Sequence, residues 1–219
     1  MAANIFDGST DSNWGTAANW SLNAVPTATD ANVATFDATS PACTVNASAR
    51  VCNGLDFTGY TNTITMTFQI TVSGSVTLAS GMGVAGTGAL IVNTTSTLTS
   101  NGKAWPNALT LSFGTLTFAD NWTTSGLLTL NTSVTLNGFQ ISCAEGLNAA
   151  SLSNTAGTTH IIMTGTGTVQ GGASSFLKNN LTINTAGTIT FATTNPFNYH
   201  TGTFTYTAGT VVTTGSTLV

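Results

Sequence analysis

Apolar and polar residues alternate along almost the whole chain, and this alternation constrains the fold more than any other feature. Ile64, Met66, Phe68, Ile70 and Val72 share one side of a predicted strand, and threonine occupies most of the positions between them. Leu109, Leu111 and Phe113 share one side of another. Successive side chains of a β-strand point to opposite faces, so this spacing predicts strands with one buried face. No segment has a sustained helical spacing with capping residues. We therefore expect an all-β chain.

The alternating strands also resemble one another. A strand, a turn rich in Asn, Ala or Gly and a second strand recur at a spacing of roughly 20 to 25 residues, which is typical of a solenoid. The clearest copies are residues 112–118, 131–138, 184–191 and 206–213. The repeat predicts a β-solenoid (parallel β-helix) with around eight coils stacked at about 4.8 Å, a rod of about 40 Å. A β-sandwich or meander of short strands is the alternative.

Charged residues make up only 5% of the chain, whereas threonine contributes 47 of its 219 residues. Thr is β-branched and favours a pleated surface, so a surface made of strands can replace charge with Thr. The three cations Arg50, Lys103 and Lys178 are dispersed, and the net charge is -4. This distribution excludes a basic patch for nucleic acid. No apolar run reaches the roughly 18 residues of a membrane span.

The first 60 residues differ in composition from the rest of the chain. They contain two of the four tryptophans and five of the seven acidic residues. We expect residues 1–60 to form a cap and attachment segment and residues 61–219 to form the solenoid rod. The residues expected to carry the cap are Trp14, Trp20, Pro26, Asp30, Phe36 and Asp37.

The N-terminal segment also carries a resemblance. A Trp-Gly-Thr stretch is followed by Asn-Trp-Ser, Val-Pro-Thr with a later Asp, Phe-Asp, a Thr-Val strand and a Leu-x-Phe strand. These landmarks are Trp14, Asn19, Trp20, Ser21, Val25, Pro26, Thr27, Asp30, Phe36, Asp37, Thr44, Val45, Cys52, Leu55 and Phe57. The pattern resembles repetitive β-helical fibre or appendage proteins of tailed bacteriophages. It is also similar to the β-helices of autotransporter-like bacterial adhesins.

The resemblance implies a non-enzymatic virion structural protein, either a fibre or appendage subunit or a capsid-decoration subunit. Its expected partners are other virion proteins, further copies of itself (a trimer is one expected form) and a host surface glycan. The N-terminus lacks the cationic start and apolar stretch of a signal peptide, which favours assembly into a virion in the host cytoplasm. The alternative is an adhesin fragment on a bacterial cell surface.

Some β-helices cleave polysaccharides, so a depolymerase is a third hypothesis. Glycoside hydrolysis needs two facing carboxylates. Beyond Asp56 only Asp120 and Glu145 remain, and the repeat could place them about one coil apart. The alternative interpretation is a turn Asp and an isolated loop Glu. His160 and His200 lack an acidic neighbour in sequence, and a nucleophile elbow is absent. We expect no catalytic residues and no cofactor.

The remaining candidates are cysteines, aspartates and aromatic residues. Cys43 and Cys52 could form a disulfide, although buried free thiols, Cys143 included, are the preferred interpretation. Asp7, Asp11, Asp30 and Asp37 do not have the spacing of an EF-hand, so we expect turns and caps and no metal site. Four aromatic residues are candidates for contact with a glycan or another subunit: Trp105, Trp122, Phe197 and Tyr199.

Overall fold

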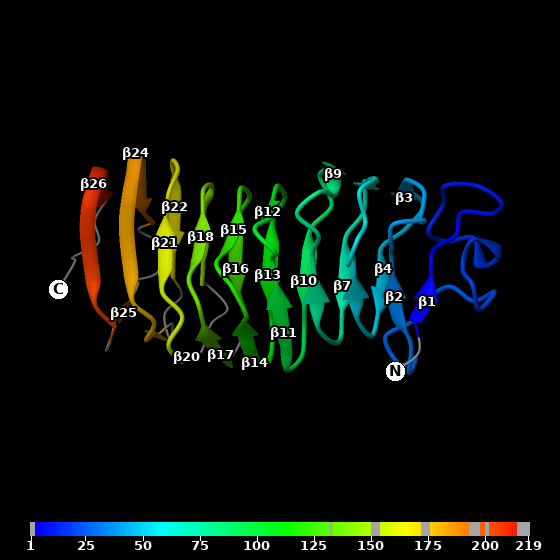
Figure 1. Cartoon of the computed structure of the whole chain (residues 1–219). Coiled ribbons are helices and arrows are strands. Elements are labelled where there is room, and N and C mark those ends of the chain that lie inside the picture. The colour runs from blue at the N-terminus through cyan, green and yellow to red at the C-terminus, as the bar shows by residue number, and fades with distance from the viewer. Residues whose placement is uncertain are drawn as a thin grey trace.

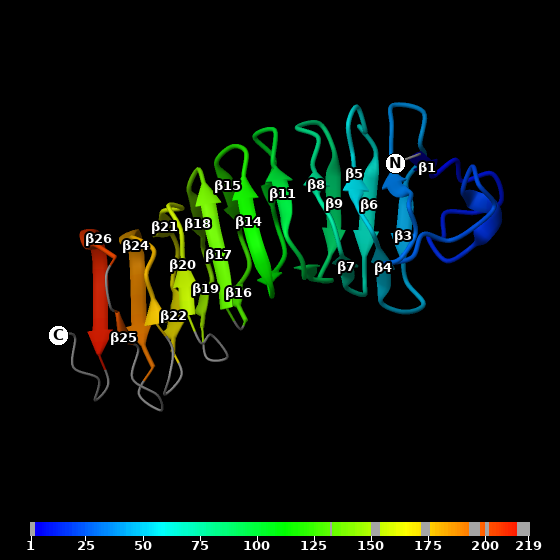
Figure 2. The same ribbon diagram turned by 90° about the horizontal axis from the view of Figure 1, so that it is seen from below.

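The strands stack side by side along a single axis (Figures 1 and 2). The computed structural model describes residues 3–131, 133–149, 154–171, 176–192, 198–199 and 202–213. All strand pairs in this part of the chain are parallel. The prediction of a β-solenoid of about eight coils is confirmed. A sandwich or meander is wrong, because both would pair neighbouring strands antiparallel.

Most coils contribute one strand to each of three faces. Face 1 is an eight-stranded sheet. Its strands are β1 (Ala3–Ile5), β2 (Val33–Thr35), β5 (Leu55–Asp56), β8 (Val76–Thr77), β11 (Ser96–Thr99), β14 (Gly114–Phe118), β17 (Ser133–Gly138) and β20 (Asn154–Ala156).

The second strand of each coil lies on face 2 and the third on face 3. Face 2 consists of β3 (Cys43–Val45), β6 (Thr63–Met66), β9 (Gly83–Gly86), β12 (Ala104–Trp105), β15 (Trp122–Thr124), β18 (Ile141–Cys143) and β21 (Ile161–Met163). Face 3 consists of β4 (Arg50–Cys52), β7 (Ile70–Val72), β10 (Leu90–Val92), β13 (Leu109–Leu111), β16 (Leu128–Leu130), β19 (Gly146–Asn148) and β22 (Gly167–Gln170).

Faces 2 and 3 join near the C-terminal end of the rod. The long strand β24 (Leu181–Phe191) pairs with both β21 and β22, and β26 (Phe204–Thr213) pairs with β24. The short strands β23 (Phe176–Leu177) and β25 (Asn198–Tyr199) form a separate pair. The described helical structure is one 3₁₀ turn, η1 (Ala17–Asn19). Among the described residues, none forms a helix long and apolar enough to cross a membrane.

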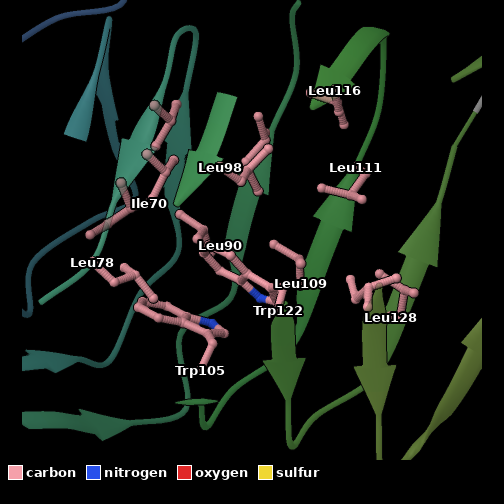
Figure 3. Close-up of a cluster of buried hydrophobic side chains, with 14 of the residues drawn as sticks. Ile70, Leu78, Leu90, Leu98, Trp105, Leu109, Leu111, Leu116, Trp122 and Leu128 are labelled. Atoms are coloured by element: carbon pink, nitrogen blue, oxygen red, sulfur yellow. The ribbon is translucent and has the colours of Figure 1, made fainter. Parts of the chain in front are cut away.

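The core consists of apolar rows that run along the rod axis. On face 3, Ile70, Leu90, Leu109, Leu128 and Leu147 pair in register, and each is fully buried. Figure 3 shows the first four of them on one side of the interior. These partners are 19 or 20 residues apart, at the short end of the predicted repeat. Each side chain therefore packs on its counterpart in the next coil.

Two residues expected in these rows lie outside the core. Phe68 is 43% exposed and Phe113 is 55% exposed. Phe68 lies at the corner between β6 and β7, and Phe113 lies at the corner between β13 and β14. Alternation holds within a strand only, because the chain changes direction at each corner and the inward side is set anew. The placement of both residues in the core was therefore wrong.

Asparagine side chains connect successive coils at the corners. The side-chain amides of Asn62 and Asn101 donate to the carbonyl oxygens of Ser40 and Leu78, at 2.8 Å and 2.7 Å, in the preceding coil. Corner carbonyls have no ladder partner of their own, and a buried carbonyl without a hydrogen bond is costly. The corner asparagines thus satisfy the backbone where the sheets are interrupted.

Some corners also require glycine. Gly138 has φ 91°, and a Cβ there would lie 2.1 Å from the carbonyl oxygen of Phe118. Gly102 has φ 75°, but a Cβ there would have no heavy atom within 4 Å. The two positions share the left-handed conformation and differ in the distance to the neighbouring coil.

We predict that Gly138→Ala destabilises the fold by roughly 1–3 kcal/mol more than Gly102→Ala, because only the first substitution pushes two coils apart. Gly102→Ala controls for the backbone strain common to both positions. The measurement is the free energy of unfolding in urea. Equal losses for the two variants would contradict the close approach at Gly138.

Candidate functional site

The N-terminal end of the rod is sealed by a cluster of aromatic rings. Phe6, Trp14, Trp20 and Phe36 are at most 1% exposed. The ring centroids of Trp14 and Trp20 are 5.0 Å apart, and those of Phe6 and Trp20 are 5.2 Å apart, both edge to face. Phe36 stacks on Phe57 at 4.9 Å and so joins the cluster to the next coil. These rings close the end of the core and offer no surface for attachment.

The same segment covers an open sheet edge. The N–H of Trp14 donates to the carbonyl of Thr44 at 3.0 Å, and the N–H of Thr44 donates to the carbonyl of Ser12 at 2.7 Å. Residues 12–14 thereby pair with β3, the first strand of face 2. An uncovered edge of a parallel sheet would be a template for pairing with other chains.

The coils begin before the predicted boundary at residue 60. β1 pairs with β2, and β2 pairs with β5, so face 1 crosses that position without a break. Residues 6–32 contain none of the named strands and meet the sheets mainly through the pairing of residues 12–14 with β3; Figure 1 places this segment at one end of the rod. Within it Pro26 is buried and Asp30 is half-buried. The carboxylate of Asp30 accepts the N–H of Thr27 at 2.7 Å.

Asn19 holds the cap loop together, a role that the sequence did not reveal. Its side chain is fully buried, and its Oδ1 accepts the N–H groups of Thr10 and Asp11 at 2.9 Å and 3.0 Å. Its amide nitrogen donates to Asp11 Oδ1 at 2.6 Å and to the carbonyl of Asn13 at 2.8 Å. All its hydrogen-bonding groups are therefore used within the loop.

Two cap aspartates have lowered pKa values because their carboxylates accept hydrogen bonds. For Asp11 the donors are the N–H of Asn13, then Asn19 and the hydroxyl of Thr16. For Asp37 the donors are the hydroxyl and N–H of Thr39, then Ser40. Hydrogen bonds to the ionised form favour that form, so a carboxyl that accepts them has a lowered pKa.

We predict that the cap loses stability in acid. A carboxylate whose pKa is lower in the folded state stabilises the fold above its unfolded pKa, and this stabilisation is lost as the pH falls through the folded pKa. The unfolding temperature should therefore fall below about pH 4, the ordinary range of Asp. The Asp11→Asn, Asp37→Asn double variant should lose less on acidification. An identical acid profile for wild type and variant, by circular dichroism, would refute this role.

Trp105 and Trp122 are components of the core. Both are fully buried, and Figure 3 shows them inside the coil with Leu78, Leu90 and Leu109. Their predicted contact with a glycan or a second subunit is wrong, because a side chain with no exposed surface cannot reach either. Phe197 lies outside the described residues, as does the side chain of Tyr199. For that pair the hypothesis stays a prediction.

The two acids considered for catalysis lie at opposite ends of face 2. Trp122 pairs with Ile141 and Thr124 with Cys143, while Asp120 precedes the first pair and Glu145 follows the second. At about 3.3 Å per residue they are roughly 15–20 Å apart, against at most about 9.5 Å in an inverting glycosidase. The carboxylate of Asp120 accepts the N–H groups of Ser100 and Asn101 at 2.8 Å and 2.7 Å. Asp120 therefore stabilises the turn at Ser100 and Asn101 in the preceding coil.

The two histidines differ in what the structure describes. His160 directly precedes β21, and its Nε2 lies 2.7 Å from the hydroxyl of Thr182. His200 lies outside the described residues. In the part of the chain that is described, no three His, Cys, Asp or Glu side chains come together to hold a metal ion.

A groove of mixed polar and apolar lining lies where face 3 turns into face 1. Its volume is about 390 Å³, and it crosses four successive coils. It is lined by Val33, Asn53, Gly54, Leu55, Asp56, Ser73, Gly74, Ser75, Thr77 and Thr95. The corner glycines and serines leave this hollow because their side chains are absent or short. The lining combines apolar surface with hydroxyl groups, one amide and the carboxylate of Asp56, so the groove can exchange hydrogen bonds with a ligand that also has apolar faces.

All three cysteines are free and buried, and the possible bond between Cys43 and Cys52 is not formed. Burial raises the pKa of Cys52 and of Cys143 to about 12, and it raises the pKa of Cys43 well above its ordinary value. The interpretation as buried small hydrophobes is confirmed. Such thiols carry almost no thiolate, the reactive form, at neutral pH.

We predict that iodoacetamide leaves all three cysteines unmodified in the folded protein at mildly alkaline pH. In concentrated guanidinium chloride all three should be alkylated, because unfolding exposes them and restores ordinary pKa values. Intact-mass spectrometry counts the added groups. Rapid labelling of any one cysteine under folding conditions would mean that its coil opens readily.

Comparisons with family models, with curated proteins and with solved structures found no match to this chain. The resemblance to phage fibre proteins or to adhesins therefore stays a hypothesis that rests on the N-terminal landmarks.

Proposed function

We propose that the chain is a non-enzymatic structural rod of a bacteriophage particle, a fibre, appendage or capsid-decoration subunit. The observation that carries the proposal is one uninterrupted core of stacked side chains, closed at the N-terminal end by the aromatic cap. Such a stack resists bending and local opening because each coil is held by its neighbours on both sides.

The charge distribution supports the same role. A net charge of -4 with 5% charged residues leaves few groups for binding a charged substrate or polymer. The wide separation of Asp120 and Glu145 speaks against the depolymerase hypothesis. The protein would then act by its shape and rigidity, and would join other virion proteins outside the sealed core.

The proposal predicts that the protein co-purifies with phage particles from its source through a density gradient, and that an antibody against it labels the particles in electron micrographs. Recovery only in a bacterial envelope fraction would contradict it and favour the adhesin alternative. Release of reducing ends from host polysaccharide by the purified chain would contradict the non-enzymatic part.

A further inference from the structure

The groove on face 1 runs along the rod axis. Val33, Gly54 and Ser75 occupy equivalent positions in three successive coils, as the register of their neighbours shows, and Thr95 lies in the fourth. Four coils are separated by three spacings of about 4.8 Å each, so the groove is roughly 14 Å long. A ligand that fills the groove must therefore be extended and must follow the stacking direction of the coils.

The hydroxyl groups in the groove are oriented by the fold. Ser75 Oγ accepts the N–H of Thr97, and Thr95 Oγ1 accepts the N–H of Thr115, each at 3.2 Å. A hydroxyl that accepts from the backbone keeps its own proton, which it can donate to a ligand oxygen. The structure assigns neither proton an acceptor among the described residues. Both hydroxyls are therefore positioned as donors on the outer surface.

Asp56 supplies the complementary acceptor. Its Oδ1 receives the N–H and the hydroxyl of Thr58 at 2.9 Å and 2.6 Å, which fixes the carboxylate in place. Its Oδ2 remains able to accept hydrogen bonds from ligand hydroxyls. The groove thus offers two fixed donors and a fixed acceptor on three successive coils.

This lining selects against most classes of ligand. It contains no cation, and Asp56 would repel phosphate, sulfate or carboxylate groups. The groove has apolar and polar surface in similar amounts, and a lipid or an amphipathic helix would leave its hydroxyl groups without hydrogen bonds. The groove lies on a sheet whose strands are already paired, so a peptide has no free edge to extend. A neutral ligand rich in hydroxyl groups fits what remains.

An exposed aromatic ring lies beyond one end of the groove. Phe113 lies on the same corner, one coil beyond Thr95, and the bond from the Thr115 N–H to Thr95 holds these two coils together. Its side chain is 55% exposed, whereas all four tryptophans are buried. Exposed rings pack against the C–H faces of sugars, as apolar surfaces beside polar groups do in ligand sites.

We propose that this groove, extended by Phe113, binds a neutral oligosaccharide. The inference rests on the proposed function, because it names the receptor class and the contact surface of a rod that meets a host cell. Phe113 and the groove residues are accessible to a glycan, whereas Trp105 and Trp122 are buried.

The test is a titration of the purified chain with maltohexaose, laminarihexaose and a neutral mannan oligosaccharide. Binding is measured as changes in the amide chemical shifts in NMR spectra. At least one of them should shift the amides of residues 54–56, 74–77 and 95, and an oligosialic acid should not. Phe113→Ala should weaken binding by roughly three- to tenfold, the size of one aromatic contact. Phe139→Ala is the matched control, because this ring is 57% exposed at a different corner and should not affect binding.

A second pair of variants separates binding from folding. Thr77→Lys places a long side chain in the groove and should abolish the shifts, whereas Thr129→Lys makes the same change on face 3 and should not. The proposal is overturned if none of the neutral oligosaccharides shifts the groove amides, if the shifts map to another face, or if Phe113→Ala and Phe139→Ala behave alike. These outcomes leave the assembly of the rod into particles untouched, because that is measured on the particles themselves.

Discussion

The hydrogen-bond ladder between coils determines most other properties of this molecule. Most strands form hydrogen bonds with the coils on either side, as in the bonds from Ile70 N–H to the carbonyl of Ala89 and from Leu90 N–H to the carbonyl of Ala108, both 3.0 Å. On face 2 the ladder is interrupted between β9 and β12. The ladder fixes the spacing of coils at about 4.8 Å. At some corners the backbones of neighbouring coils therefore lie very close together. At Gly74, for example, a Cβ would lie 1.9 Å from the carbonyl oxygen of Asn53.

The ladder also explains how much of the fold could be predicted from the sequence. Alternation predicted the inward residues wherever the chain runs straight, because a strand has a strict period of two. It failed at Phe68 and Phe113, because each corner resets the inward side and corner length varies between coils. Trp105 and Trp122 were placed outside for a similar reason. In the sequence Trp105 precedes a proline and Trp122 follows an Asp-Asn pair, and both patterns are typical of turns. In the fold, however, Trp122 pairs in register with the apolar Ile141.

The sites were harder to predict than the fold. In the sequence Asn19 is one landmark of the N-terminal resemblance, and only the folded loop brings together the four groups with which its side chain forms hydrogen bonds. The groove on face 1 arises from small residues about 20 positions apart, such as Gly54 and Gly74. A search for charged or aromatic motifs does not detect a hollow that is created by missing side chains. The close repeat of small corner residues was the available signal.

The scarcity of charge follows from the same stacking. Outward residues of neighbouring coils lie directly above one another, as Thr110 and Thr129 do on face 3. Two like charges at that spacing repel, so a repeated charged position would destabilise every coil that carries it. Threonine avoids this repulsion, favours the strand and keeps a hydrogen-bonding group on the surface. The surface of a rod built in this way carries many hydroxyl groups and few charges, so the proposed neutral, hydroxyl-rich ligand matches it better than a charged one would.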